Sequence, residues 1–304
     1  MSEIFSIILT IIAPIILVAA VGILLDRTNS SLDARTLSRA IIYAASPALA
    51  FYSMANATLQ SSEVVSLFSF AILQAFAATV AAWLITRLLR MDRLTASAFV
   101  LTVGFMNIGN YGIPFNEFSF GKPGLERALV VTVGQQFYVY SVGVFVASWG
   151  QASIWQSLKN AARVPTPYAA MAGLLVNFSG FEVPALLMRL VQILQSAAIP
   201  LMLLLLGVQI SRVKFKAGKW SVVFGASAMR LLGGPLIGMA VAAMLGLQGV
   251  SWQVAAVEGA MPTAVVTTIL ATEFRSDAQI ASSVVLVSTL FSVVTLSVLL
   301  LFIR

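Results

Sequence analysis

The chain has 304 residues, of which 60% are hydrophobic and only 10% are charged, and its mean hydropathy is +0.97. Because a soluble globular domain carries about 25% charged residues, this composition indicates a membrane protein. The sequence contains no His and no Cys, which excludes disulfides, thiolate nucleophiles, histidine bases and the usual zinc sites, and argues against an enzyme.

Ten apolar segments follow one another along the chain, separated by short polar breaks. A helix needs about 20 apolar residues to cross a hydrocarbon core of roughly 30 Å. The sixth segment has the shortest clean apolar stretch and begins at the Pro165-Thr166-Pro167 break. We predict an all-α integral membrane protein whose ten transmembrane helices cover residues 4–25, 37–54, 64–89, 94–120, 125–149, 164–178, 183–210, 220–247, 252–274 and 280–303.

The basic residues predict how these spans are oriented. Thirteen Lys and Arg residues flank the spans on one side, whereas the other side has only Lys122, Arg127 and Arg304. Since cytoplasmic loops carry the excess of positive charge, we expect both termini to lie outside the cell. The net charge of +7 then reflects topology and requires no nucleic-acid partner.

Prolines at matching places indicate an internal repeat. Pro47 and Pro200 are 153 residues apart, and Pro114 and Pro262 are 148 apart, both close to half the chain length. We therefore predict two repeats of five helices, residues 1–149 and 164–304, joined by a cytoplasmic linker over 150–163. Because five is odd, the second repeat must be inverted in the membrane. The alternative is coincidence, since prolines are frequent in transmembrane helices.

The fourth segment contains a stretch that is unsuited to a helix interior. Residues 104–117 include three glycines and Pro114, and also Asn107 and Asn110, which would be expensive facing lipid. The ninth segment has a related stretch around Met261, Pro262 and Thr263.

Two broken helices in matching positions predict a binding site where they cross. Half-helices starting near Pro114 and Pro262 would direct two partially positive N-terminal ends at one point, which suits a carboxylate. The residues expected to bind the substrate are Asn107, Asn110, Gly112, Pro114, Met261, Pro262 and Thr263. The alternative is a pair of proline kinks that bind nothing.

These motifs resemble those of the auxin efflux carrier family, which includes plant PIN proteins and bacterial malonate and malate carriers within the bile acid/auxin/arsenite transporter superfamily. The resemblance covers essentially the whole chain. The linker is short, unlike the long central loop of many plant carriers. This difference favours a compact bacterial-type member, which would lie in the bacterial inner membrane. The residues that carry the resemblance are Asn107-x-Gly109-Asn110-x-Gly112-x-Pro114, Ala260-Met261-Pro262-Thr263-Ala264, Ala198-Ile199-Pro200 and Leu205-x-Gly207.

The resemblance implies that the spans form two domains, a scaffold and a transport domain. Spans one, two, six and seven would form a scaffold through which the protein makes a homodimer. Spans three to five and eight to ten would form a transport domain that carries the crossover and moves by an elevator mechanism.

The fifth segment has a polar patch over residues 135–141. Gln136 and Tyr140 lie four residues apart and share one helix face, while Gln135 and Tyr138 share another. In the resembled family this helix lines the substrate pocket, so Gln136 and Tyr140 are the first candidates for substrate binding and Gln135 and Tyr138 the second. Hydrogen bonding between helices is the alternative.

Two charged residues fall inside predicted spans near the crossover. Glu258, four residues before Pro262, is a candidate for binding a coupling proton or sodium ion. Arg230 could counter a substrate anion, or the two residues could simply form an ion pair. No other cofactor and no metal site is expected.

The leading hypothesis is a secondary transporter of a small auxin-, malate- or malonate-like carboxylate that works by alternating access. A sodium-coupled carrier of the bile acid type is one alternative. A membrane receptor that does not transport is another.

Overall fold

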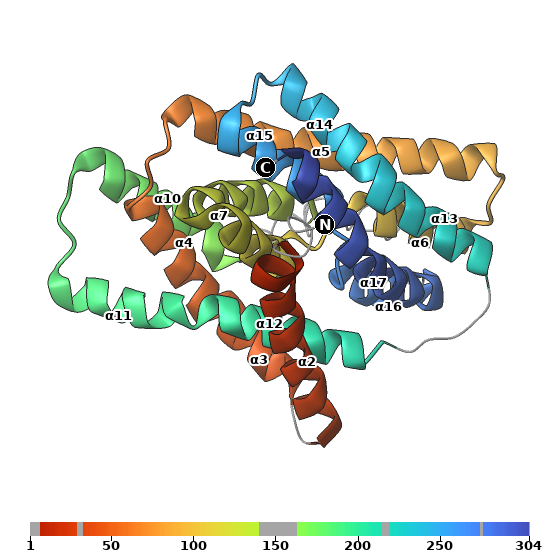
Figure 1. The fold of residues 1–304 in the computed structure, drawn as a ribbon, viewed down its shortest axis with the longest axis horizontal. Helices are drawn as coiled ribbons and strands as arrows, with labels where there is room; N and C mark the ends of the chain where they lie inside the picture. The colour runs from red at the N-terminus through yellow and green to blue at the C-terminus, as the bar shows by residue number, and fades with distance from the viewer. Residues whose placement is uncertain (1–6, 29–32, 140–162, 214–218, 274–275, 304) are drawn as a thin grey trace.

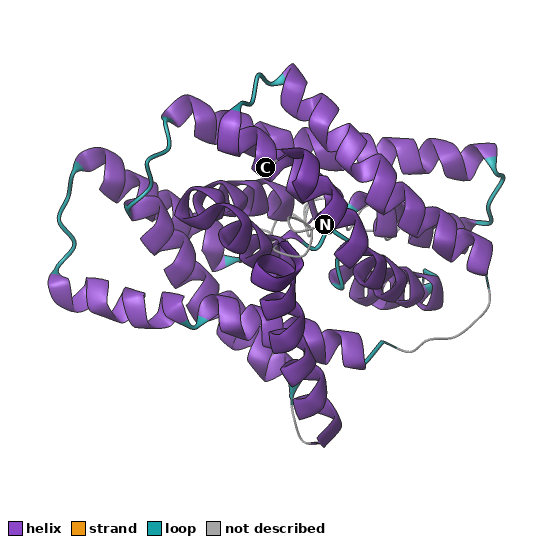
Figure 2. Ribbon diagram, in the orientation of Figure 1, coloured by secondary structure: helices purple, strands orange, loops and turns teal. Residues whose placement is uncertain are grey.

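The computed structural model describes residues 7–28, 33–139, 163–213, 219–273 and 276–303. Within these ranges the chain is helical, and the only β pairing is an isolated bridge between Met106 and Thr263. Figure 2 shows helices joined by short loops. The structure therefore agrees with the predicted all-α class. Tyr140, the end of the fifth predicted segment and nearly all of the predicted linker lie outside the described residues.

The first half of the chain folds into helices that follow the first five predicted segments. Short π-helical stretches, labelled η, continue directly into α-helices. A residue with positive φ, Gly121 (φ 65°), divides α7 between the fourth and fifth segments. The elements are η1 (Ile8–Ile12), α2 (Ala13–Thr28), α3 (Ala34–Ala40), η2 (Ile41–Ala45), α4 (Ser46–Ala55), α5 (Ser61–Leu88), α6 (Arg93–Gly104), η3 (Ile108–Gly112) and α7 (Ile113–Tyr138).

The second half follows the remaining segments. Its first helix begins at Pro165, where a missing N–H costs nothing, and ends at Gly180 in the left-handed conformation (φ 66°). The elements are α10 (Pro165–Ser179), α11 (Ala185–Ser196), α12 (Ala198–Ser211), α13 (Trp220–Ala228), η5 (Met229–Gly233), α14 (Gly234–Met244), α15 (Gly249–Ala260), α16 (Val266–Glu273) and α17 (Ala278–Ile303).

Within the described ranges, five continuous helical runs are long and apolar enough to cross a membrane. They coincide with the first, third, seventh, eighth and tenth predicted spans. The fourth and ninth segments are instead interrupted, as their glycines and prolines predicted. The runs are Ile8–Thr28, Ser61–Leu88, Ala185–Ser211, Trp220–Met244 and Ala278–Ile303.

The helices pack in two groups. In the first, α2 packs on α12, and α4 packs on α10 and α11. Glycines allow α2 and α12 to approach closely, because a Cβ on Gly22 would collide with the carbonyl of Leu204, and a Cβ on Gly207 with that of Ala19. This group occupies the lower and left part of Figure 1.

The second group surrounds the two interrupted helices. Here α5 packs on α6 and α7, α13 on α17, and α14 on α15, which in turn contacts α7. Most of this group lies in the upper and right part of Figure 1. The segment η3 contacts α12, so the first interruption lies where the two groups meet.

Candidate functional site

The interruptions of the two broken helices lie side by side. The first separates α6 from η3 at residues 105–107, and the second separates α15 from α16 at residues 261–265. The backbone N–H of Asn107 donates to the carbonyl of Pro262 at 2.8 Å, and the N–H of Ala264 donates to the carbonyl of Phe105 at 2.9 Å. Backbone groups that the breaks release thus satisfy one another, as buried non-helical backbone requires.

The half-helices after the breaks do not start where we predicted. They begin at Ile108 and Val266, not near Pro114 and Pro262. Pro114 lies within the helical run that η3 opens, directly after the π-helical turn in which the N–H of Gly112 donates to the carbonyl of Asn107 and that of Ile113 to the carbonyl of Ile108. Prolines and π-helical turns both mark places where the regular hydrogen bonds of an α-helix are interrupted. Pro262 lies in the non-helical segment before its half-helix, with its carbonyl bonded to Asn107.

Asn107 stands at the start of the first half-helix with its side chain pointing into a closed environment. It is 6% exposed, and its amide nitrogen has no hydrogen-bond partner in the described part of the chain. An unsatisfied buried donor of this kind costs about 1–3 kcal/mol. The Asn107 amide is therefore available to a ligand oxygen.

The face of α7 that meets the crossover carries Gln135 and Tyr138. The side-chain nitrogen of Gln135 donates to the carbonyl of Met106 at 3.0 Å, and the ring of Tyr138 lies 5.9 Å from that of Phe105. Gln136 is half-buried on another face, because successive helical residues point about 100° apart. The second-ranked pair thus contacts the crossover, and Tyr140 lies outside the described residues.

Thr263 joins the second break to its neighbours. Its hydroxyl donates to the carbonyl of Thr102 at 2.7 Å, and its backbone N–H donates to the Ser288 hydroxyl at 3.1 Å. Met261, Pro262 and Thr263 are all buried. These side chains hold the crossover together.

Glu258 lies at the end of α15, against the first half-helix. One carboxylate oxygen accepts from the Asn116 side chain at 2.8 Å, and the same Asn116 nitrogen donates to the carbonyl of Gly112 at 2.9 Å. The other oxygen, Oε2, has no hydrogen-bond partner among the described residues. Glu258 is 0% exposed, so it is an enclosed acid with one oxygen available.

Arg230 does not pair with Glu258, so the alternative of an ion pair between these two residues is excluded. The guanidinium donates to the carbonyl of Val103 at 2.7 Å and to that of Gly259. The ion pairs between described residues all involve other side chains. Arg230 therefore caps the C-terminal ends of α6 and α15, where the helix dipole favours a positive charge.

Sequence reasoning missed Gln74, an entirely buried amide on α5. Its side-chain nitrogen lies close to Gly238 and Gly259, and neither of its polar atoms has a hydrogen-bond partner in the described ranges. The available signal was that Gln74 is the only amide within the predicted span 64–89.

A cavity of about 630 Å³ lies beside the crossover, between α3, α12, α16 and α17. None of the predicted site residues lines it. Val265 does, two residues after Thr263, and so does Gln209, whose side-chain oxygen lies 3.5 Å from the amide nitrogen of Asn110. The cavity wall also includes Arg35, Arg39 and Arg212.

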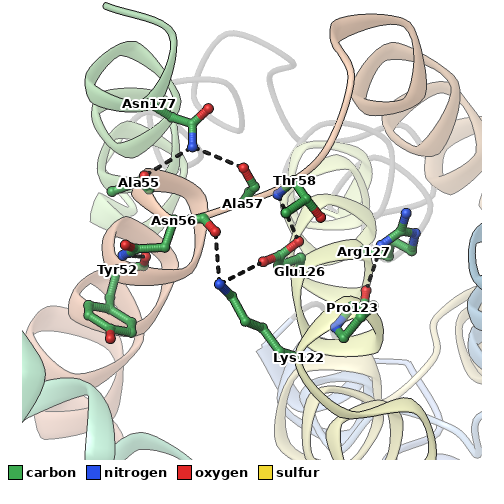
Figure 3. A network of polar contacts seen from close by, with 10 residues as sticks. All are labelled: Tyr52, Ala55, Asn56, Ala57, Thr58, Lys122, Pro123, Glu126, Arg127 and Asn177. Atoms are coloured by element: carbon green, nitrogen blue, oxygen red, sulfur yellow. Dashed lines mark hydrogen bonds and ion pairs between the residues drawn. The ribbon is translucent and has the colours of Figure 1, made fainter. Parts of the chain in front are cut away.

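At the other end of the molecule, polar contacts join the loop after α4 to α7 (Figure 3). The ammonium of Lys122 donates to the carbonyl of Asn56 at 2.9 Å and lies 3.7 Å from the carboxylate of Glu126. Glu126, which is 1% exposed, also accepts from the backbone N–H of Thr58 at 3.3 Å. Asn177 on α10 donates to the carbonyl of Ala55 at the end of α4 and to that of Ala57 in the loop. This end is closed by direct contacts between the two helix groups.

Comparison with known proteins gives a consistent result. Residues 7–157 and 151–300 match the family described as "Membrane transport protein". An uncharacterized transporter of Methanothermobacter thermautotrophicus is 29% identical over 87% of each chain, and one of Methanocaldococcus jannaschii is 24% identical over 87% of this chain and 88% of that protein. A probable auxin efflux carrier component of Oryza sativa subsp. japonica is 30% identical over 57% of this chain and 28% of its own.

Proposed function

The chain belongs to the auxin efflux carrier family of membrane transport proteins, and from this we propose that it is a secondary carrier of a small organic anion. Family membership makes it a multi-pass membrane transporter and not an enzyme. The carboxylate substrate, the mechanism and the coupling are our proposals. The observation that carries them is the crossover, where two half-helices begin beside a buried amide donor that lacks a partner.

Chemistry at the crossover supports an anionic substrate. The N-terminal ends of η3 and α16 carry partial positive charge, and the Asn107 amide adds a neutral donor. Asn110 would complete the site on the side of α12, since its amide already reaches Gln209. A carboxylate would supply the acceptor oxygens that these donors lack.

The packing supports two inverted repeats. Each break donates one backbone hydrogen bond to the other, from residue 107 to residue 262 and from residue 264 to residue 105. The two breaks are therefore equivalent in their bonding. In the two repeats, α2 corresponds to α10 and α4 corresponds to α12. The packing of α2 on α12 is therefore equivalent to the packing of α10 on α4. In this proposal the first helix group is a scaffold that forms a homodimer, and the second is the transport domain.

The contacts at one end of the molecule and the cavity at the other support an inward-facing state of the transporter. The end with Lys122 and Glu126 is closed by contacts between the groups, while the cavity lies at the arginine-rich end, which the distribution of basic residues assigns to the cytoplasm. An elevator movement of the transport domain would break the contacts of Lys122 with Asn56 and of Glu126 with Thr58. With this orientation in the membrane, both termini would lie outside the cell.

Glu258 is the proposed coupling residue. A single enclosed carboxylate with one available oxygen suits a proton or a sodium ion. The amide of Gln74, which has no partner among the described residues, lies close to Gly259, the residue after Glu258. Groups of three acidic side chains that could hold a more highly charged ion are absent from the described residues. Arg230 acts by positioning α6 and α15.

The test is flux in proteoliposomes. Labelled malate, malonate and indole acetate are offered under proton, sodium and substrate gradients. We expect at least one to be transported, and Asn107→Ala and Asn110→Ala to reduce its uptake at least 10-fold. Asn56→Ala, which alters an exposed amide at the end of α4, should transport normally. Binding without flux would favour a receptor, and strict sodium dependence with preference for larger amphipathic acids would favour a bile acid type of carrier.

A further inference from the structure

The cavity beside the crossover has a basic wall that the transport site does not use. Four residues of α3 line it, Ala34, Arg35, Ser38 and Arg39. They form one helix face, since positions four apart lie one above the other. Both arginines are exposed, and no acidic residue belongs to the described lining of the cavity.

Three acidic residues next to the lining, Asp26, Asp33 and Asp277, have hydrogen-bond partners other than the guanidinium groups of Arg35 and Arg39. Asp33 caps the start of α3, where its carboxylate accepts from the backbone N–H of Arg35 at 3.0 Å and from the Thr36 hydroxyl at 2.7 Å. Asp26 forms an ion pair with Arg212 at 2.6 Å. The guanidinium groups of Arg35 and Arg39 form no ion pair with another described residue.

The opposite walls are largely apolar, with Leu205, Val265 and Ile269 among their residues. Charges facing such walls interact more strongly with an anion than they would in bulk water. Each guanidinium can hold a carboxylate through two parallel hydrogen bonds. Two of them one helical turn apart match a short molecule with a carboxylate at each end.

We propose that Arg35 and Arg39 form a second binding site, distinct from the crossover, that holds a small dicarboxylate in the cavity. This inference rests on the proposed function. The two arginines lie on α3, which continues through η2 into α4 of the first helix group, so they stay in place when the crossover moves, whereas the walls from α16 and α17 move with the crossover. Gln209 links the two sites, because it lines the cavity and also contacts Asn110.

The test is equilibrium binding of labelled malonate to the purified full chain, which requires no transport. We expect two malonate molecules per wild-type chain. Arg35→Gln combined with Arg39→Gln should bind one molecule, or bind the second at least about 10-fold more weakly, since a charge-assisted hydrogen bond is worth about that factor or more. Asn107→Ala should lose the other molecule and keep the arginine site.

Arg27→Gln is the matched control, because Arg27 lies at the same end of the molecule without lining the cavity. Replacing both site arginines by lysine keeps the charge and should restore part of the affinity, which separates a binding defect from misfolding. Unchanged stoichiometry and affinity in the double glutamine variant would overturn the arginine site, as would a wild type that binds no malonate, or a single molecule that the double glutamine variant still binds. Two bound molecules without any flux would refute the proposed function alone.

Discussion

The carboxyl group of Glu258 packs directly against the α-carbon of Gly112. A Cβ atom at position 112 would lie 2.5 Å from one carboxylate oxygen and 2.9 Å from the other. The first half-helix of the crossover and the end of α15 can therefore approach this closely only with glycine at position 112. The contact joins the first half-helix of the crossover to the proposed coupling residue.

Gly112→Ala should disturb this contact. The added methyl group must displace the carboxylate from Asn116, and overpacking of this kind costs typically about 1–3 kcal/mol. We expect a lower thermal unfolding temperature in detergent and a loss of coupled uptake. Gly109→Ala on the same half-helix is the control, because a Cβ there meets nothing within 4 Å. Equal stability of the two variants would show that Gly112 and Glu258 are not tightly packed.

Glu258→Gln should remove the dependence of uptake on a proton or sodium gradient while leaving exchange of substrate intact. The amide keeps the size of the side chain but can neither carry the proton nor supply a negative charge. The measurement is initial uptake in proteoliposomes with and without each gradient. Glu182→Gln changes an exposed acid and should behave as the wild type. Unaltered gradient dependence in Glu258→Gln would refute the assignment.

Arg230→Met should destabilise the protein by about 3–5 kcal/mol, because it leaves two buried carbonyls, those of Val103 and Gly259, without their charged donor. Thermal unfolding in detergent measures the loss. Arg189→Met, on the exposed face of α11, is the matched control. If Arg230 instead served only to bind the substrate, the variant would unfold like the wild type and lose affinity alone.

Lys122→Met should ease opening of the closed end. It removes the hydrogen bond to the Asn56 carbonyl and the ion pair with Glu126, and because Lys122 is 58% exposed the loss in stability should be below about 1 kcal/mol. The chain has no native cysteine, so a single cysteine introduced at Asn110 can report access from that end through its labelling rate. We expect faster labelling than in a Lys122→Arg control, and an unchanged rate would argue against a gate there.

Asp92 gives a prediction about pH outside the spans. Hydrogen bonds from Lys219 and Thr95 hold the pKa of the Asp92 carboxyl well below its usual range. The stability from this contact is present above the ordinary aspartate pKa of about 3.9 and is lost as the pH falls toward the lowered value. Asp92→Asn should therefore unfold at a slightly lower temperature than the wild type, by the same amount at pH 5 and at pH 8. The difference between the two proteins should narrow only below about pH 4. A deficit that changes between pH 5 and pH 8 would contradict the contact.

Local composition was enough to predict where the helices break. Glycines and prolines are unfavourable in a helix interior and asparagines are costly in lipid, and together they identify residues 104–117 and the region of Pro262 as breaks. The exact starts at Ile108 and Val266 could not be predicted, because they depend on backbone bonds between the two breaks.

Contacts between side chains and main-chain atoms could not be predicted from the sequence either. Arg230 binds carbonyl groups, which every residue carries, so the sequence pointed to Glu258 instead. The choice between Gln135 and Gln136 depended on the rotation of α7 against the crossover, which periodicity alone does not fix. Arg35 and Arg39 were used only to orient the chain, since nothing in the sequence brings α3 next to α16.

Substrate counterflow in proteoliposomes tests the carrier most directly. Vesicles are loaded with unlabelled substrate, and the uptake of labelled substrate is followed with no net gradient of protons or sodium. We expect internal substrate to accelerate uptake of the label in the wild type and in Glu258→Gln, and Asn107→Ala to abolish the acceleration. Uptake that internal substrate leaves unchanged would contradict alternating access at the crossover.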